Sequence, residues 1–161
     1  MRSLVVFLAA VLVGCSSSTS SSTAPSTSTE SGAPPGDPKA YLDKAAAQPG
    51  AVRTDSGLVY RELRAGSGES PKASDTVTVH YRGTLVDGTE FDSSYKRNEP
   101  AQFPLSQVIP CWTEGVQKMK VGGKSELVCP ASIAYGDRGS PPVIPGGATL
   151  IFEVELLKIG G

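Results

Sequence analysis

The sequence predicts an α+β domain in which a curved antiparallel β-sheet packs around one short α-helix. Apolar and polar residues alternate in "TVTVHYRGTL" (76–85), "KSELVCP" (124–130) and "TLIFEVELLKI" (149–159), and this alternation indicates strands with one buried face. After residue 50 the one strong helical pattern is "SQVIPCWTEGVQKM" (106–119), so this helix is expected to cover the buried face of the sheet.

The first 14 residues, "MRSLVVFLAAVLVG", have the features of a signal peptide. Arg2 supplies a positive charge, the apolar run is too short to span a membrane, and small residues precede Cys15. The segment "LVGC" resembles the lipobox of bacterial lipoproteins, in which the cysteine after the cleavage site carries the lipid. The resemblance implies a lipid anchor on Cys15 in the bacterial cell envelope, at the outer membrane if the cell has two, with the domain in the periplasm or at the cell surface. The alternative is an ordinary secretory signal with an incidental cysteine.

Residues 15–36 begin with this cysteine and consist largely of Ser, Thr, Pro, Gly and Ala. They offer little apolar surface to bury, so the segment is expected to be a disordered tether. Residues 37–52 contain "DPKAYLDKAAAQ", which predicts a short helix with Asp37 as its N-cap and Pro38 in its first turn, followed by a linker. The apolar face of that helix consists of Tyr41, Leu42, Ala45 and Ala46. The main domain is expected to span residues 53–161.

The composition excludes several classes of function. The net charge is −1, and no run of basic residues is interleaved with aromatics, so nucleic acid is not an expected partner. The single histidine, His80, lies on the polar side of its strand pattern, which leaves too few partners for a metal site or a catalytic triad. Glycine-rich phosphate loops and nucleophile elbows are also missing from the sequence. We therefore expect chemistry without a metal, a cofactor or a charged nucleophile.

The entrance of the helix at 106–119 is the first candidate binding site. Pro110 suits the first helical position, and Ile109 before it keeps a backbone N–H that the helix does not use. Val108 and Ile109 are apolar, and Trp112 begins the apolar face of the helix. The aromatic residues near this helix, strand ends and the long loop 131–148 are Tyr81, Phe91, Phe103, Trp112, Tyr135 and Phe152. Each alone is more often a core residue, but together they predict an apolar concavity with a few polar groups, among them Asp92.

Several motifs then identify a family. The segments "VTVHYRGTLVDGTEFDSSYKRNEPAQFPL", "VIPCWTEGVQKMKVGGK", "AYGDRG" and "ATLIFEVELLKI" closely resemble FKBP-type peptidyl-prolyl cis-trans isomerases. The helix "DPKAYLDKAAAQ" followed by "VRTDSGLVYREL" resembles the bacterial subgroup related to macrophage infectivity potentiator. The resemblance covers about residues 53–160 and implies an antiparallel sheet wrapped around one short helix, in agreement with the residue patterns.

The resemblance also implies a set of site residues. The expected catalytic groups are Tyr81, Asp92, the Ile109 N–H and Tyr135. The expected substrate-binding residues are Phe91, Ala101, Val108, Trp112, Val143, Ile144 and Phe152. Ala101 stands where many members of the family carry a phenylalanine of the pocket, so one wall should be lower and the affinity for macrolide ligands weaker. Cys111 replaces the glycine that usually precedes the tryptophan.

The implied function is rotation about X–Pro bonds in extracytoplasmic proteins, as a folding helper that acts on proline-containing polypeptides. Rotation moves no proton and breaks no covalent bond, so it needs no metal, cofactor or catalytic triad. The alternative is a non-catalytic prolyl-peptide-binding chaperone or a surface interaction lipoprotein. We expect a monomer, because longer members of the subgroup dimerise through extended N-terminal helices and only one short helix precedes the domain here.

The remaining cysteines, Cys111 and Cys129, are expected to form a disulfide. The expected compartment is oxidising, and lipidation of Cys15 would leave just this pair. Cys129 lies on the inward side of its strand pattern, and Cys111 opens the helix that covers that side. Two buried thiols that pack as small apolar groups are the alternative.

Overall fold

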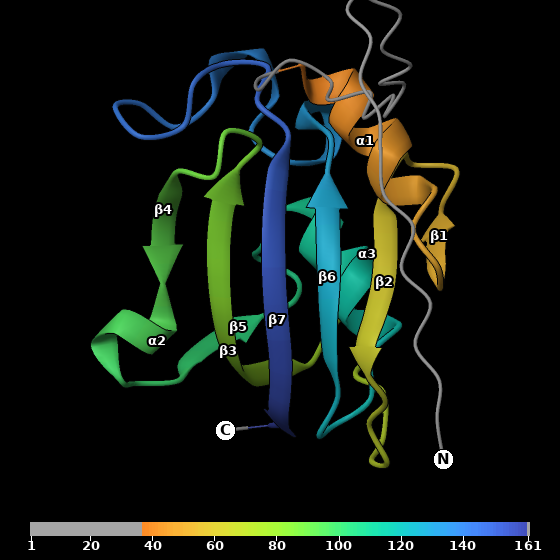
Figure 1. The fold of residues 1–161 in the computed structure, drawn as a ribbon. Helices are drawn as coiled ribbons and strands as arrows, with labels where there is room; N and C mark the ends of the chain where they lie inside the picture. Colours follow the sequence, from red (N-terminus) through yellow and green to blue (C-terminus); the bar gives the residue numbers. More distant parts are fainter. Residues whose placement is uncertain (1–36, 161) are drawn as a thin grey trace, which may run out of the picture. The chain divides into compact units, whose positions relative to one another are not determined.

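The computed structural model describes residues 37–160, so the predicted signal peptide, the lipidated cysteine and the tether lie outside the described residues. The described part is an α+β fold (Figure 1), which confirms the predicted class. Its helices are α1 (Pro38–Ala46), α2 (Ser94–Arg97) and α3 (Pro110–Gln117), with short 3₁₀ turns η1 (Ala131–Ile133) and η2 (Gly136–Arg138). Its strands are β1 (Ala51–Arg53), β2 (Val59–Arg64), β3 (Thr76–Leu85), β4 (Glu90–Ser93), β5 (Ala101–Pro104), β6 (Lys124–Cys129) and β7 (Leu150–Ile159).

The strands of the described region form one antiparallel sheet. Its order is β1-β2-β6-β7-β3-β4, and β5 pairs with the other end of β3. The two longest strands, β3 and β7, pair along nearly their whole length at the centre of the sheet. Both ends of β3 therefore carry further strands, β4 at one end and β5 at the other, on the side away from β7. Figure 1 shows β4 at the edge of the sheet beyond β3, and α3 behind β6 and β2.

Helix α3 covers the inner face of the sheet, as the sequence predicts. Trp112, Val116 and Met119 are buried against inward side chains such as Val77 and Leu127. The alternation in β3 is confirmed, because Val77, Val79 and Tyr81 are buried while the residues between them are at least partly exposed. Gly115 permits this close packing, since a Cβ atom there would lie 2.7 Å from the side chain of Leu127.

Among the described residues, α1 covers one end of the outer face of the sheet. The carboxylate of Asp37 accepts hydrogen bonds from the N–H groups of Lys39 (2.9 Å) and Ala40 (3.3 Å), which caps the helix as predicted. Leu42 and Ala45 pack on Val59 and Val128. Val128 alternates with the inward residues Leu127 and Cys129 and so faces outward, and it is buried because α1 covers this end of the outer face. The apolar face of α1 is thus used within the chain.

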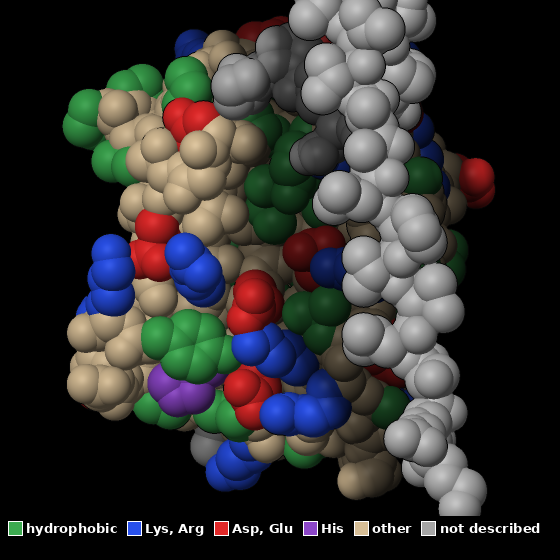
Figure 2. All heavy atoms as spheres, in the orientation of Figure 1, with side chains coloured by type: hydrophobic (Ala, Val, Ile, Leu, Met, Phe, Trp, Pro, Cys, Tyr) green, Lys and Arg blue, Asp and Glu red, His purple; other side chains and the backbone are tan. Residues whose placement is uncertain are grey.

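Figure 2 shows acidic and basic side chains gathered on this face of the sheet, with some hydrophobic ones between them. Ion pairs join neighbouring strands, among them Arg61–Glu126, Lys124–Glu153 and Arg82–Glu90. Each such exposed pair contributes little to stability, so the main effect of these residues is to keep that face polar. Between residues 37 and 160, no helix is both long and apolar enough to cross a membrane.

Candidate active site

A cavity of about 540 Å³ opens between the start of α3, the β3–β4 hairpin, β7 and the loop after η1. Its volume lies in the range of small-ligand pockets. The predicted site residues that line it are Tyr81, Phe91, Asp92, Val108, Ile109, Trp112, Tyr135, Val143, Ile144 and Phe152. Segments far apart in the sequence therefore meet at one place, and most of the lining is apolar.

Trp112 forms the floor of the cavity, and only 4% of its surface is exposed. Three aromatic rings surround it in edge-to-face contact, those of Tyr81 (5.3 Å between centroids), Phe103 (5.4 Å) and Phe152 (5.3 Å). Such perpendicular contacts are favourable for aromatic pairs and fix the ring planes. A proline ring placed on this floor would be surrounded by carbon atoms.

Phe91 forms a further wall because β3 carries a glycine beneath it. The Phe91 ring contacts Phe152 edge to face at 5.5 Å. A Cβ atom on Gly83 would lie 2.5 Å from Phe91 and 3.0 Å from Phe152. The absence of a side chain at residue 83 therefore lets both rings lie against the sheet.

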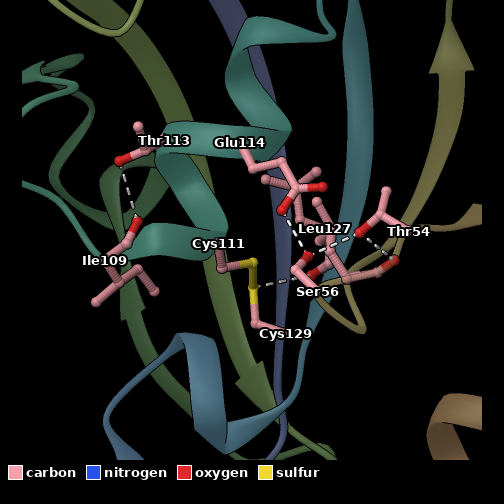
Figure 3. Close-up of a disulfide and its surroundings, with 9 residues drawn as sticks. Thr54, Ser56, Ile109, Cys111, Thr113, Glu114, Leu127 and Cys129 are labelled. Carbon is pink, nitrogen blue, oxygen red and sulfur yellow. Dashed lines mark hydrogen bonds between the residues drawn. A yellow bond between two sulfur atoms is a disulfide. The ribbon is translucent and has the colours of Figure 1, made fainter.

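The start of α3 places a free donor at the cavity. Ile109 is the N-cap residue, with an extended backbone (φ −58°, ψ 147°), and Pro110 follows in the first turn. The Ile109 carbonyl accepts from the Trp112 N–H at 2.9 Å. It also accepts from the Thr113 hydroxyl at 3.5 Å, as Figure 3 shows. The Ile109 N–H has no hydrogen-bond acceptor among the described residues. It can therefore donate to a carbonyl oxygen of a bound peptide, aided by the positive end of the helix dipole.

Tyr81, Asp92 and Arg97 form a polar cluster, and its first two members line the same cavity. The Tyr81 hydroxyl donates a short hydrogen bond to Asp92 Oδ2. Arg97 donates from Nη1 to Asp92 Oδ1 (2.6 Å) and from Nη2 to the Tyr81 oxygen (3.1 Å). Two other cations near Asp92 in the sequence, Arg82 and Lys96, pair with Glu90 instead.

This cluster keeps the Asp92 carboxylate charged. Partial burial acts to raise the pKa of Asp92, but the hydrogen bonds from Tyr81 and Arg97 outweigh it and lower that pKa below its ordinary value. The pKa of the Tyr81 phenol is raised, first by burial and then by its bond to Asp92, so it stays protonated near neutral pH. The cluster thus presents a fixed negative charge and an oriented phenol at the rim of the cavity.

The loop after η1 closes the remaining side. Ser140 and Ile144 exchange two backbone hydrogen bonds (2.8 and 2.9 Å), which folds residues 140–144 into a compact turn. Ile144 is buried, while Val143 is 49% exposed and Tyr135 is 41% exposed. The two exposed residues extend the apolar surface beyond the cavity, where the chain on either side of a bound proline could lie.

One predicted binding residue does not line the cavity, and several unpredicted ones do. Ala101 pairs with Val79 on the inner face, but its side chain ends at Cβ and does not reach the cavity. The lining residues that the sequence did not predict are Gln107, Ser140 and Pro141, while Phe103 was predicted as one of the aromatic residues of the concavity but not as a binding residue. Arg97 was missed because no periodic pattern marks the four-residue helix α2 that carries it.

Cys111 and Cys129 are joined by a disulfide (Figure 3). Their Cα atoms lie 5.8 Å apart, and both residues are fully buried. The bond connects the first turn of α3 to the end of β6, directly beside the Trp112 floor. Among residues 37–160, no group of three or more His, Cys, Asp or Glu side chains is arranged to hold a metal ion.

The fold and the aromatic cavity are those expected of an FKBP-type domain. The model of the FKBP-type peptidyl-prolyl cis-trans isomerases matches residues 67–157, and the chain belongs to this family. FkpA of Escherichia coli is 53% identical over 121 residues, which are 75% of this chain and 44% of that protein. Mip of Coxiella burnetii is 46% identical over 121 residues, 75% of this chain and 53% of that protein, in agreement with the predicted subgroup. The chain spans about half the length of the curated relatives it matches.

Two solved structures are similar to this one. The crystal structure of FkpA from Escherichia coli superposes with a TM-score of 0.74 at 52% identity, over 76% of this chain and 57% of that one. The structure of a peptidyl-prolyl cis-trans isomerase from Pseudomonas syringae gives a TM-score of 0.72 at 35% identity, over 77% of this chain and 91% of that one. Both similarities confirm the predicted fold.

Proposed function

We propose that this chain catalyses cis-trans rotation about X–Pro bonds in proteins outside the cytoplasm and so helps them fold. The observation that carries the proposal is an apolar cavity floored by Trp112 that is lined both by Ile109, with its free N–H, and by the charged Asp92. Membership of the family supports it. Proline-containing polypeptides are the proposed substrates.

The geometry suggests how rotation is accelerated. The X–Pro bond resists rotation because of amide resonance, with a barrier of roughly 18–20 kcal/mol. A prolyl ring on the Trp112 floor would bring its amide out of water, and this disfavours the charge-separated planar form. The Ile109 N–H and the Tyr135 hydroxyl can hold peptide carbonyl oxygens. The oriented phenol of Tyr81 and the negative charge of Asp92 then act on the amide as it twists. Groups that are fixed before the reaction favour the transition state over both ground states.

A protease-coupled turnover assay with a proline-containing peptide tests the proposal on the purified chain. Acceleration of isomerisation by the wild-type chain is expected. A chain that binds the peptide, as seen by the fluorescence of its single tryptophan, but leaves the isomerisation rate unchanged would instead be a non-catalytic prolyl-peptide-binding chaperone. A chain that does neither would be a surface interaction lipoprotein with an idle domain.

We further propose that the chain is a monomer with a lipid anchor on Cys15, on the outer membrane if the cell has two, and with its domain in the periplasm or at the cell surface. The signal-like residues 1–14 support the anchor. The packing of α1 on its own sheet supports the monomer, since its apolar face is already covered. Light scattering tests the mass in solution.

Macrolides are a second proposed class of ligand, with an affinity reduced by the alanine at residue 101. Titration of the chain with a macrolide, followed by the fluorescence of Trp112, tests this affinity.

A further inference from the structure

Two adjacent buried serines lie where β4 ends and α2 begins. In the ladder between β3 and β4, Arg82 pairs with Ser93 and Gly83 with Asp92. The next residue along β4 would face Tyr81, but Ser94 is already the first residue of α2. The main chain therefore leaves the sheet at the point where the backbone of Tyr81 still needs hydrogen-bond partners.

The Ser94 side chain supplies those partners. Its hydroxyl oxygen accepts a hydrogen bond from the Tyr81 N–H at 2.8 Å. The same hydroxyl donates to the Tyr81 carbonyl oxygen at 3.2 Å. Ser94 is fully buried, so water does not compete for these bonds. A single hydroxyl thus replaces the two hydrogen bonds that a neighbouring strand would make with Tyr81. The residues after Ser94 can therefore form a helix without loss of these bonds.

The first turn of α2 is held by further contacts on the outer face. His80 Nδ1 lies 2.9 Å from the Ser94 hydroxyl; because that hydroxyl gives its hydrogen to Tyr81, Nδ1 acts as the donor here. The His80 ring stacks on Tyr95 at 4.9 Å between centroids. The Tyr95 hydroxyl donates to Glu155 on β7 at 3.3 Å, and Glu155 pairs directly with His80 across the strands.

The direction that α2 takes from Ser94 decides where Arg97 lies. Arg97 follows three residues later, and its guanidinium bonds both Asp92 and the Tyr81 phenol. Ser94 therefore affects both the backbone and the phenol oxygen of Tyr81. It holds the backbone directly, and through α2 it brings Arg97 to the phenol oxygen.

We propose that Ser94 is a positioning residue for isomerisation, which sets the place of the Tyr81 phenol and of the Asp92–Arg97 pair at the rim of the cavity. This inference rests on the proposed function. Ser94 does not line the cavity, so it acts through Tyr81 and not on the peptide. Loss of its hydroxyl should misplace the phenol while the Trp112 floor stays intact.

Ser94→Ala tests the inference, with Ser93→Ala as its matched control. Both serines are buried, but the Ser93 hydroxyl has no hydrogen-bond partner among the described residues. We expect Ser94→Ala to lower kcat/KM by about five- to tenfold at a temperature where all variants are folded, and Ser93→Ala to leave it within about twofold. Peptide affinity, titrated through Trp112 fluorescence, should change little in either variant.

Two more readouts separate positioning from stability. The emission of Trp112, whose ring touches Tyr81, should change in Ser94→Ala and stay as in wild type in Ser93→Ala. Ser94→Thr keeps the hydroxyl, so its turnover per folded molecule should exceed that of Ser94→Ala, even if its melting temperature is no higher. Equal turnover per folded molecule in Ser94→Ala and Ser93→Ala would overturn the inference. An inactive wild-type chain would overturn the proposed function instead, so the two failures are distinguishable.

Discussion

The carboxylate of Asp92 is the one fully charged group at the cavity that takes hydrogen bonds from two other site side chains. It has no packing role, since its side chain is 43% exposed. Its charge is held by Tyr81 and Arg97 rather than by burial. Asp92 therefore separates an electrostatic account of catalysis from one in which the apolar floor alone is sufficient.

Replacement of Asp92 by asparagine should remove the charge and keep the shape. We expect kcat/KM to fall about fivefold or more, because a charge that acts on the twisting amide contributes mainly in the transition state. The melting temperature should change little, since the amide oxygen of the new side chain can still accept the bond from the Ser93 N–H. Turnover and thermal melts on the same preparation test this. Unchanged turnover per folded molecule in a less stable variant would show that Asp92 only supports the turn.

The pH dependence of turnover should report on the same carboxylate. The pKa of Asp92 is lowered in the folded chain, so its charge and the stability that comes with it are present above about pH 4 and are lost as pH falls through the lowered pKa. Arg97→Gln removes a hydrogen bond and a positive charge, so the pKa of Asp92 should rise. Profiles of kcat/KM against pH should then lose activity at a higher pH in Arg97→Gln than in wild type.

Arg82→Gln is the control for this experiment, because Arg82 pairs with Glu90 and not with Asp92. Its acid limb should coincide with that of wild type. If the acid limbs of Arg97→Gln and Arg82→Gln coincide, Asp92 does not control the pH profile.

At the level of residues, periodicity and motif together predicted most of the cavity. Tyr81 and Phe152 lie at inward positions of period two, and Trp112 begins the apolar face of a helix, so local pattern suffices to place them. Arg97 could not be placed in this way. Its contact with Asp92 depends on the direction of α2, which is set by the bonds of Ser94 to another strand.

Among the elements, α3 has two roles, one in the core and one at the cavity, and both depend on the same eight residues. Its apolar face fills the core, and its first turn presents the Ile109 N–H to the cavity. The disulfide holds this first turn to β6. The end of α3 that serves the site is therefore also the end that is covalently fixed.

Removal of the disulfide should lower the free energy of unfolding, but the chain should still fold. Cys111 and Cys129 are 18 residues apart, and the closure of a loop of this size contributes about 3 kcal/mol in the chain-entropy model. We expect the double variant Cys111→Ala/Cys129→Ala to unfold at lower denaturant concentration than wild type. Dithiothreitol should destabilise wild type and leave the double variant unchanged. Two free thiols from this pair in the denatured, unreduced wild-type chain would show that the bond is absent.

The elements that sequence analysis missed are the shortest ones. Strand β1 has three residues, and β4, β5 and α2 have four each, too few to show a period of two or of 3.6. They form because neighbours complete them: β1 pairs with β2, while β4 and β5 pair with opposite ends of β3. Long periodic segments were predicted correctly because their own pattern is sufficient.

For the molecule as a whole, the fold class could be predicted from the sequence, but the order of the strands in the sheet could not. One-sided alternation together with a single strong helix predicts a sheet that covers a helix, and the structure confirms it. The order β1-β2-β6-β7-β3-β4 depends on pairings between strands that are far apart along the chain. Such pairings are decided by packing in three dimensions, so neither composition nor periodicity records them.

The lipid anchor is a property of the whole chain that the fold does not test, since residues 1–36 lie outside the described part. Acyl chains contribute about 0.8 kcal/mol per buried CH₂, so a chain that carries several on Cys15 should enter the detergent phase. We expect wild type, produced in a bacterium, to incorporate labelled palmitate and to partition into detergent. Cys15→Ala should incorporate none. A matched chain in which residues 1–15 are replaced by a cleavable secretory signal should stay in the aqueous phase and isomerise peptides at the wild-type rate, since α1 and the sheet it packs on are retained. Equal labelling of wild type and Cys15→Ala would rule out this anchor.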